Sequence, residues 1–119
     1  MENVTLADLV EKVKSTVDFT NVGMIACHNG VVRGTSRDGK PVSILEIDVD
    51  LNKVEMVINE MRSKKGIAAV EAHIFPGIRK VGEDVMLVVV AGDFRENVFK
   101  TLEETVNKLK ETVVHKKER

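Results

Sequence analysis

Hydrophobic residues recur along this chain at two intervals, and the interval distinguishes helices from strands. Between Leu6 and Val13 they follow the spacing of one helix face, and Thr5 opens the segment in the pattern of a capping box. We therefore predict a helix that ends near Thr16. Residues 22–28 form a short apolar run rich in β-forming side chains, which indicates a buried strand.

The next predicted strand alternates instead of forming a continuous apolar run. An Asp-Gly pair in residues 34–40 precedes it and predicts a hairpin-like excursion. Residues 42–50 then have a period of two, which places apolar and acidic side chains on opposite faces. We interpret the acidic face as exposed and charge-paired rather than catalytic. The apolar face holds Leu45, Ile47 and Val49, and the acidic face holds Glu46, Asp48 and Asp50.

A second helix is expected between Asp50, whose side chain suits an N-cap, and Gly66, which suits a C-cap. Apolar residues recur between them at helical spacing, so one stripe of this helix should face the core. The members of that stripe are Leu51, Val54, Val57, Ile58 and Met61.

Further strands are predicted in the second half of the chain. A strand over residues 68–75 leads to a turn at Pro76-Gly77, after which residues 78–81 are expected to pair locally. Residues 85–91 are almost all apolar, and such a strand is usually covered on both faces. We therefore place it in the middle of the core.

The last predicted helix begins at a capping-box pair, Asp93 and Glu96, and leads into a short basic tail at residues 113–119. Its apolar positions again share one face. The inward stripe consists of Val98, Phe99, Leu102, Val106 and Leu109.

This order of elements indicates an α+β fold with three helices packed on a largely antiparallel sheet. A length of 119 residues suits a single domain over residues 1–119, and 43% hydrophobic with 31% charged residues is typical of a globular chain. The apolar run at residues 85–91 is too short to span a bilayer. Because no secretory signal pattern follows Met1, we expect a cytoplasmic protein without membrane association.

Charge and residue types exclude several classes of site. With 18 basic and 19 acidic residues, a net charge of −1 and no Trp or Tyr, the chain is a poor candidate for nucleic-acid binding. The single cysteine, Cys27, has no partner for an internal disulfide. No spacing of His and Cys predicts a zinc site, and residues 48–59 lack the glycine that a calcium loop requires.

Cys27 and His28 are a thiol and an imidazole side by side in the sequence. Neighbours on a strand point to opposite faces, which disfavours a catalytic pair. We expect Cys27 to be a small core residue and His28 to face solvent or an interface.

Basic residues gather in one loop and at the C-terminal end of the chain. If the two groups meet, within one chain or across a dimer, they form a positive pocket suited to a phosphate or a carboxylate. The alternative is that each side chain is simply solvated. The loop group is Arg33, Arg37 and Lys40, and the C-terminal group is Lys108, Lys110, Lys116, Lys117 and Arg119.

Four spaced motifs carry a family resemblance. They are Gly23 with Gly30-Val31-Val32-Arg33, Pro76-Gly77 with Gly82-Glu83-Asp84, Arg95-Glu96-Asn97-Val98-Phe99, and Leu109-Lys110 with His115-Lys116-Lys117-Glu118. In this order and spacing, over about residues 22–118, the chain resembles the large, catalytic subunit of molybdopterin synthase, the MoaE family.

The resemblance implies an α/β hammerhead-type fold and an enzyme of molybdenum cofactor biosynthesis. In that family a homodimer binds two small ubiquitin-like subunits, forming a heterotetramer. Each small subunit ends in a Gly-Gly thiocarboxylate, whose sulfur is transferred to cyclic pyranopterin monophosphate to build the molybdopterin dithiolene. The resemblance implies no metal and no organic cofactor.

The resemblance also assigns roles to individual residues. Lys110 matches the catalytic lysine, and either Lys116 or Lys117 matches a second pocket lysine. Arg33 and Arg95 match the arginines that bind the anionic pterin, for which a guanidinium fork is suited.

Two positions depart from the family pattern. Phe94 stands where the family typically has His, and His115 where it typically has Trp. These departures favour an alternative, a non-catalytic MoaE-like paralogue that binds a pterin-like anion or the tail of a ubiquitin-like partner. An unrelated α+β dimerisation module is the third possibility.

Overall fold

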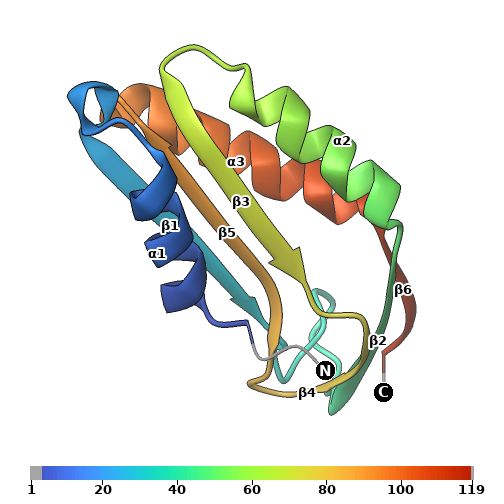
Figure 1. Ribbon diagram of the computed structural model, residues 1–119. Helices are drawn as coiled ribbons and strands as arrows, with labels where there is room; N and C mark the ends of the chain where they lie inside the picture. Colours follow the sequence, from blue (N-terminus) through green and yellow to red (C-terminus); the bar gives the residue numbers. More distant parts are fainter. Residues whose placement is uncertain (1–3, 119) are drawn as a thin grey trace.

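Two three-stranded antiparallel sheets form the scaffold of the computed structural model (Figure 1), which describes residues 4–118 and, beyond Val113, the backbone alone. The first sheet has the order β1-β5-β3 and the second the order β4-β2-β6. The strands of the first sheet are β1 (Met24–Val31), β3 (Ile67–Ile74) and β5 (Asp84–Gly92). Those of the second are β2 (Ile44–Val49), β4 (Gly77–Lys80) and β6 (Val113–Glu118).

Helices cover both faces of the first sheet. α1 (Leu6–Thr16) packs on one face, while α2 (Leu51–Arg62) and α3 (Arg95–Thr112) lie side by side on the other (Figure 1). A short 3-10 turn, Phe19–Asn21, connects α1 to β1. The fold is therefore α+β with three helices on antiparallel sheets, as the sequence predicts.

β5 is the central strand of the first sheet, and the prediction that it lies in the middle of the core is confirmed. Its residues from Leu87 to Ala91 are fully buried, because one face meets α1 and the other meets α2 and α3. The prediction that β1 is a buried strand is wrong. β1 lies at the edge of the sheet, pairs on one side with β5, and has Ala26 as its only buried residue.

The ends of α1 and α2 follow from their caps. The Thr5–Asp8 capping box at the start of α1 is confirmed. Asp50 caps α2 by accepting hydrogen bonds from the backbone N–H groups of the next turn. The expected C-cap is wrong, because α2 ends at Arg62 and Gly66 instead turns the chain into β3 with a φ of 76°.

The predicted cap of α3 is also wrong. Asp93 accepts hydrogen bonds from the Phe94 backbone N–H and the Asn97 side-chain amide, and Phe94, the actual N-cap, makes no side-chain cap. These bonds lower the pKa of Asp93, with the Asn97 bond contributing most. The inward stripe holds buried threonines where hydrophobic residues alone were expected, and the hydroxyls of Thr105 and Thr112 bond to backbone carbonyls one turn earlier.

Two expected stripe residues point outward instead. Leu51 is 68% exposed at the start of α2, and Phe99 is 55% exposed on α3. Periodicity alone does not distinguish the centre of a stripe from its margin, so both predictions of burial are wrong.

The second sheet is where the sequence is least informative. Its central strand, β2, alternates as predicted, with Ile47 buried against the core. Residues 78–81 do not pair locally, because β4 pairs with β2. The predicted basic tail forms β6, which pairs with the other edge of β2. A β-bridge between Thr35 and Pro41 closes the loop at residues 34–40. The strands that this loop connects, β1 and β2, belong to different sheets and do not form a hairpin.

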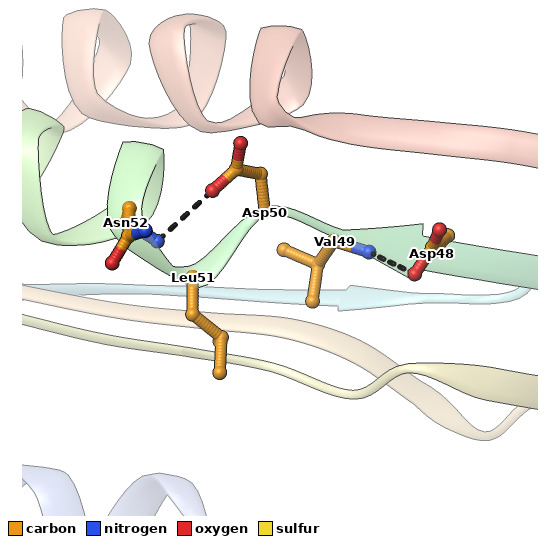
Figure 2. A pocket seen from close by; sticks show the side chains of 5 residues that line it. All are labelled: Asp48, Val49, Asp50, Leu51 and Asn52. Carbon is orange, nitrogen blue, oxygen red and sulfur yellow. Dashed lines mark hydrogen bonds between the residues drawn. The ribbon is translucent and has the colours of Figure 1, made fainter.

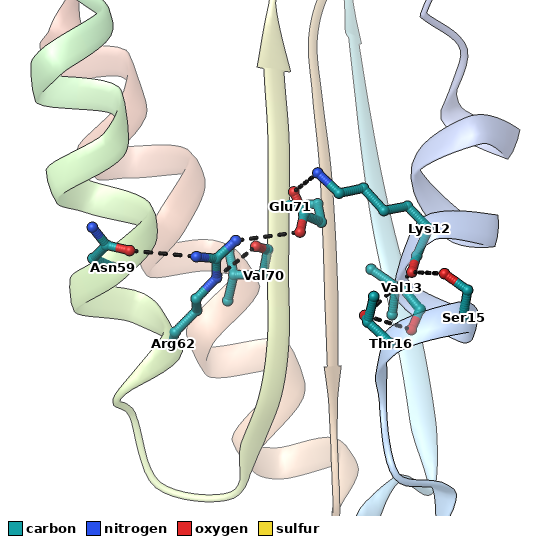
Figure 3. A network of polar contacts seen from close by, with 8 residues as sticks. All are labelled: Lys12, Val13, Ser15, Thr16, Asn59, Arg62, Val70 and Glu71. Carbon is teal, nitrogen blue, oxygen red and sulfur yellow. Dashed lines mark hydrogen bonds and ion pairs between the residues drawn. The ribbon is translucent and has the colours of Figure 1, made fainter.

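A charged network fastens the helices to the edge strand β3 (Figure 3). Glu71 lies 3.1 Å from the Lys12 ammonium of α1 and 3.2 Å from the Arg62 guanidinium of α2. Arg62 Nε also donates to the Val70 carbonyl at 3.2 Å. One carboxylate thus links helices that lie on opposite faces of the sheet.

Candidate functional site

Lys110, the predicted catalytic lysine, is exposed in the last turn of α3. A cation in this turn is favoured by the helix dipole. Lys108 lies about 200° away around the helix axis, and its ammonium pairs with Glu60 of α2 at 3.6 Å. Lys108 therefore faces α2, whereas Lys110 lies on the flank of α3 that faces away from α2 and is close enough to His28 of β1 to act on its charge.

His28 is half-buried on the face of β1 that α3 covers. Its imidazole lies over Gly30, since a Cβ added to Gly30 would come within 3.1 Å of His28 Nε2. Partial burial, and secondarily the positive charge of Lys110, lower the pKa of His28 below its ordinary value. The imidazole is consequently neutral at neutral pH.

The two neighbours on β1 exchange their expected environments. Cys27 is exposed on the α1 side rather than a core residue, and partial burial raises the pKa of its thiol. His28 points inward toward α3 rather than to open solvent. The prediction that they face opposite sides holds, and they form no catalytic pair.

Arg33 follows β1 and is exposed at the beginning of the 34–40 loop. Its Nε donates to the Thr35 carbonyl at 2.8 Å, which holds the base of the side chain against the loop. In the same loop, Lys40 lies 3.9 Å from Asp38, so this loop group is not uniformly positive.

Arg95 is the first residue of α3 and Lys110 lies near its last. Fifteen residues of helix separate them by about 22 Å. Arg95 is 79% exposed and contacts only the neighbouring carboxylate of Glu96, at 3.6 Å, among the ion pairs of the described residues. Arg95 and Lys110 of one chain are therefore too far apart to contact the same small ligand.

Lys116 and Lys117 lie on β6, where the backbone of Lys117 is paired with Glu46. Their side chains lie outside the described residues. Their predicted role as a second pocket lysine therefore stays a prediction.

Two surface hollows lie away from these basic residues. One, of about 490 Å³, lies at the junction of β2 and α2 and is lined by residues 48–52. Figure 2 shows that both of its carboxylates bind backbone: Asp50 caps α2 and Asp48 accepts the Val49 N–H. The other hollow, of about 420 Å³, lies between α1 and β1 on the Cys27 side. Neither contains Lys110 or an arginine.

Within residues 4–118, the side chains described do not bring three His, Cys, Asp or Glu residues together as metal ligands. None of the helices in this part of the chain combines the length and apolar character that a membrane crossing requires.

Comparison with known proteins identifies related sequences. The model of the MoaE family, whose description is MoaE protein, matches residues 2–112. A Haloferax volcanii protein described as a probable molybdopterin synthase is 33% identical over 122 aligned residues. That match covers 98% of this chain and 47% of the relative, so the chain spans about half of the relative's length.

Solved structures share the fold at lower sequence identity. Molybdopterin synthase from Staphylococcus aureus has a TM-score of 0.71 and 16% identity, and the match covers 87% of this chain and 79% of that one. A MoaE protein from Burkholderia ambifaria has a TM-score of 0.74 and 20% sequence identity, and the match covers 92% of this chain and 72% of that one. A chain from a Helicobacter pylori complex of subunits 1 and 2 of molybdopterin-converting factor has a TM-score of 0.68 and 17% sequence identity. The match covers 97% of this chain and 82% of that one.

Proposed function

The chain belongs to the MoaE protein family, and from this we propose that it is the large, catalytic subunit of molybdopterin synthase. In this proposal it transfers sulfur from the C-terminal thiocarboxylate of a small ubiquitin-like subunit to cyclic pyranopterin monophosphate. The observation that carries the proposal is the family match over residues 2–112, which includes Arg33, Arg95 and Lys110. A cytoplasmic location and a single domain over residues 1–119 stay predictions of the same proposal.

Lys110 is the proposed catalytic residue because it combines exposure with a rigid support. The last turn of α3 fixes its backbone, and the buried Leu109 beside it anchors that turn in the core. A lysine at such a position is suited to proton transfer or to nucleophilic assistance at the thiocarboxylate. Arg33, on the loop after β1, is the proposed phosphate contact of the same chain, with Lys116 or Lys117 as the second lysine.

We propose a homodimer because Arg95 and Lys110 lie at opposite ends of α3. The partner subunit's Arg95 would complete the site that contains Lys110, and symmetry would form two such sites. Two small subunits then give the heterotetramer. The Helicobacter pylori structure of similar fold is a complex of subunits 1 and 2, which supports a small-subunit partner for this chain as well.

A single-turnover assay tests the proposed reaction. The purified chain is mixed with a thiocarboxylated small subunit and cyclic pyranopterin monophosphate, and molybdopterin is detected. Product formation by the wild-type chain and its loss in Lys110→Ala would support the synthase. A stable complex with the small subunit but no product would instead favour the non-catalytic paralogue. Phe94, which is 66% exposed and stands where the family typically has His, is the residue that favours this alternative. If no complex forms either, only a dimerisation module of the same fold remains.

Mixed dimers test whether the site is shared between subunits. Arg95→Ala and Lys110→Ala are each expected to be inactive as pure dimers. After the two variants are unfolded together and refolded, half of the dimers are mixed, and one of the two sites in each mixed dimer is intact. About a quarter of the wild-type activity should therefore return. Persistent inactivity of the mixture would place both residues in one chain's site and contradict the proposal.

A further inference from the structure

We propose that His28 is a substrate-positioning residue, which together with Lys110 binds an anionic group of the substrate. Only the identity of this anion rests on the proposed function. His28 has no role in the family resemblance, and its position in the fold is what brings its imidazole toward α3.

The neighbours of His28 on its own face of the sheet are apolar, and α3 adds the charge of Lys110. On its own strand, Ala26 and Gly30 share its face, and across the sheet it is paired with Val88 of β5. α3 contributes Lys110, which is the one charged group of the described residues that acts on His28. None of the described residues forms a hydrogen bond with the imidazole.

This arrangement leaves the imidazole of His28 without a hydrogen-bond partner among the described residues. A half-buried imidazole has lost part of its hydration without gaining a protein partner, and the neighbouring ammonium of Lys110 opposes its protonation. An anion between them would accept a hydrogen bond from the imidazole N–H and would also neutralise Lys110.

Gly30 is a part of the same arrangement. A Cβ at this position would press on His28 Nε2 at 3.1 Å, and the Met86 carbonyl lies 3.6 Å away on the other side. The glycine thus leaves room for the ring of His28. The spacing His-x-Gly on one strand face is the sequence signal for this contact.

Two anions of the proposed reaction have the required chemistry: the phosphate of the pterin and the carboxyl end of the small subunit. Inorganic phosphate and a peptide that ends in a Gly-Gly carboxylate serve as the two probes. They distinguish the sources, because the first mimics only the pterin phosphate and the second mimics only the tail.

The first experiment follows the imidazole of His28 by NMR in the folded wild-type chain, with its resonance assigned by loss in His28→Phe. We expect one of the two probes to raise the pKa of His28. Without a probe, Lys110→Ala should also raise it, because a neighbouring positive charge is removed. Lys108→Ala is the matched control and should leave it unchanged, since Lys108 pairs with Glu60.

The outcomes of this titration are distinct. A response to phosphate alone assigns the pterin phosphate to the pair, and a response to the peptide alone assigns the tail. If the pKa of His28 responds to neither probe, the proposal is overturned. This readout does not require turnover, so it remains decisive even if the chain proves not to be a synthase.

A kinetic experiment tests the same role in an active preparation. His28→Phe keeps a flat ring but removes the hydrogen bond, and KM for the substrate that carries the anion should rise about tenfold while kcat is retained. His28→Gln, which still donates a hydrogen bond, should restore part of the affinity. A His28→Phe variant that is folded by circular dichroism and has an unchanged KM would contradict the proposal.

Discussion

Lys108 and Lys110 are chemically identical residues two positions apart on α3, and the structure gives them different surroundings. The helix turns them to different flanks, so that Lys108 pairs with Glu60 while Lys110 lies beside the half-buried His28. In the sequence both belong to one basic group. Only the packing of α3 between α2 and β1 separates them.

We expect Lys110→Ala to lower sulfur-transfer activity at least about a hundredfold, the usual contribution of a residue that transfers a proton. The free energy of unfolding should change by less than about 0.5 kcal/mol, because the position is exposed and alanine favours the helix. Lys108→Ala is the control for surface charge and should keep its activity. Activity assays measure the loss of sulfur transfer, and urea unfolding measures the change in the free energy of unfolding. Loss of folding in Lys110→Ala would count against a role in the site.

His28 should make stability depend on pH. The folded chain holds its pKa below the ordinary value of about 6.5, so the unfolded chain takes up the proton first as the pH falls. Its stabilising contribution is therefore present above pH 6.5 or so and is lost as the pH falls below it. Urea unfolding at pH 7.5 and 5.5 should show a smaller drop in His28→Phe than in the wild type. An identical drop in both proteins would show that other groups cause it.

At the scale of elements, the turn between α2 and β3 depends on a close contact that the sequence does not reveal. Gly66 has a positive φ, and a Cβ there would collide with the carboxylate of Asp93 and the amide of Asn97, which are hydrogen-bonded to each other. The start of α3 is thus fitted directly against the end of α2. This explains why Gly66 is required although it is not the C-cap.

A pair of glycine substitutions separates backbone strain from this contact. Gly39 has a similar φ of 85°, but a Cβ there would meet nothing within 4 Å. Gly39→Ala should cost about 1 kcal/mol of stability from its backbone conformation alone. Gly66→Ala should cost at least twice as much, because the Asp93–Asn97 bond must open as well. Thermal unfolding of both variants measures the difference, and equal costs would mean that the turn relaxes freely.

Strand order is the property of the elements that the pattern of residues predicts least well. Residues 22–28 and 85–91 both read as buried strands, but only β5 is central, while β1 is at an edge. The apolar residues at the start of β1 pack against the two cores, Met24 and Ala26 against one and Ile25 against the other, and the open edge of the strand does not affect its composition. The sequence signal for burial is a property of faces, so it does not report position in the sheet.

At the scale of the whole molecule, the first sheet separates two cores. Val88 belongs to the core under α2 and α3, and the adjacent Val89 belongs to the core under α1. Both are fully buried. The stability of the domain therefore depends on helices packed on both sides of one strand.

Val88→Ala and Val89→Ala should each lower the free energy of unfolding by about 2 kcal/mol, since each leaves a cavity in a different core. Val81→Ala, at a residue that is 49% exposed, is the control and should change it by less than about 0.5 kcal/mol. Urea unfolding of the three variants provides the values. A negligible cost for Val89→Ala alone would show that α1 does not form a true second core.

The candidate site also has to be understood at this scale. Sequence resemblance puts Arg33, Arg95 and Lys110 in one site, whereas the length of α3 separates Arg95 from Lys110 within a chain. Motif matches in the sequence identify candidate site residues, but they do not determine the distances between those residues in the fold. The proposed dimer would place the Arg95 end of the second subunit's α3 beside Lys110.

The sequence by itself determined the helices, the N-caps of α1 and α2, the alternation of β2, the burial of β5, the α+β class and the family motifs. These follow from local spacing and from residues that act within one turn or one strand. Only the tertiary structure decided that β1 is an edge strand, that residues 113–118 form β6, and that His28 lies beside Lys110. Those outcomes depend on contacts between segments far apart in the chain, which leave no periodic trace in either segment alone.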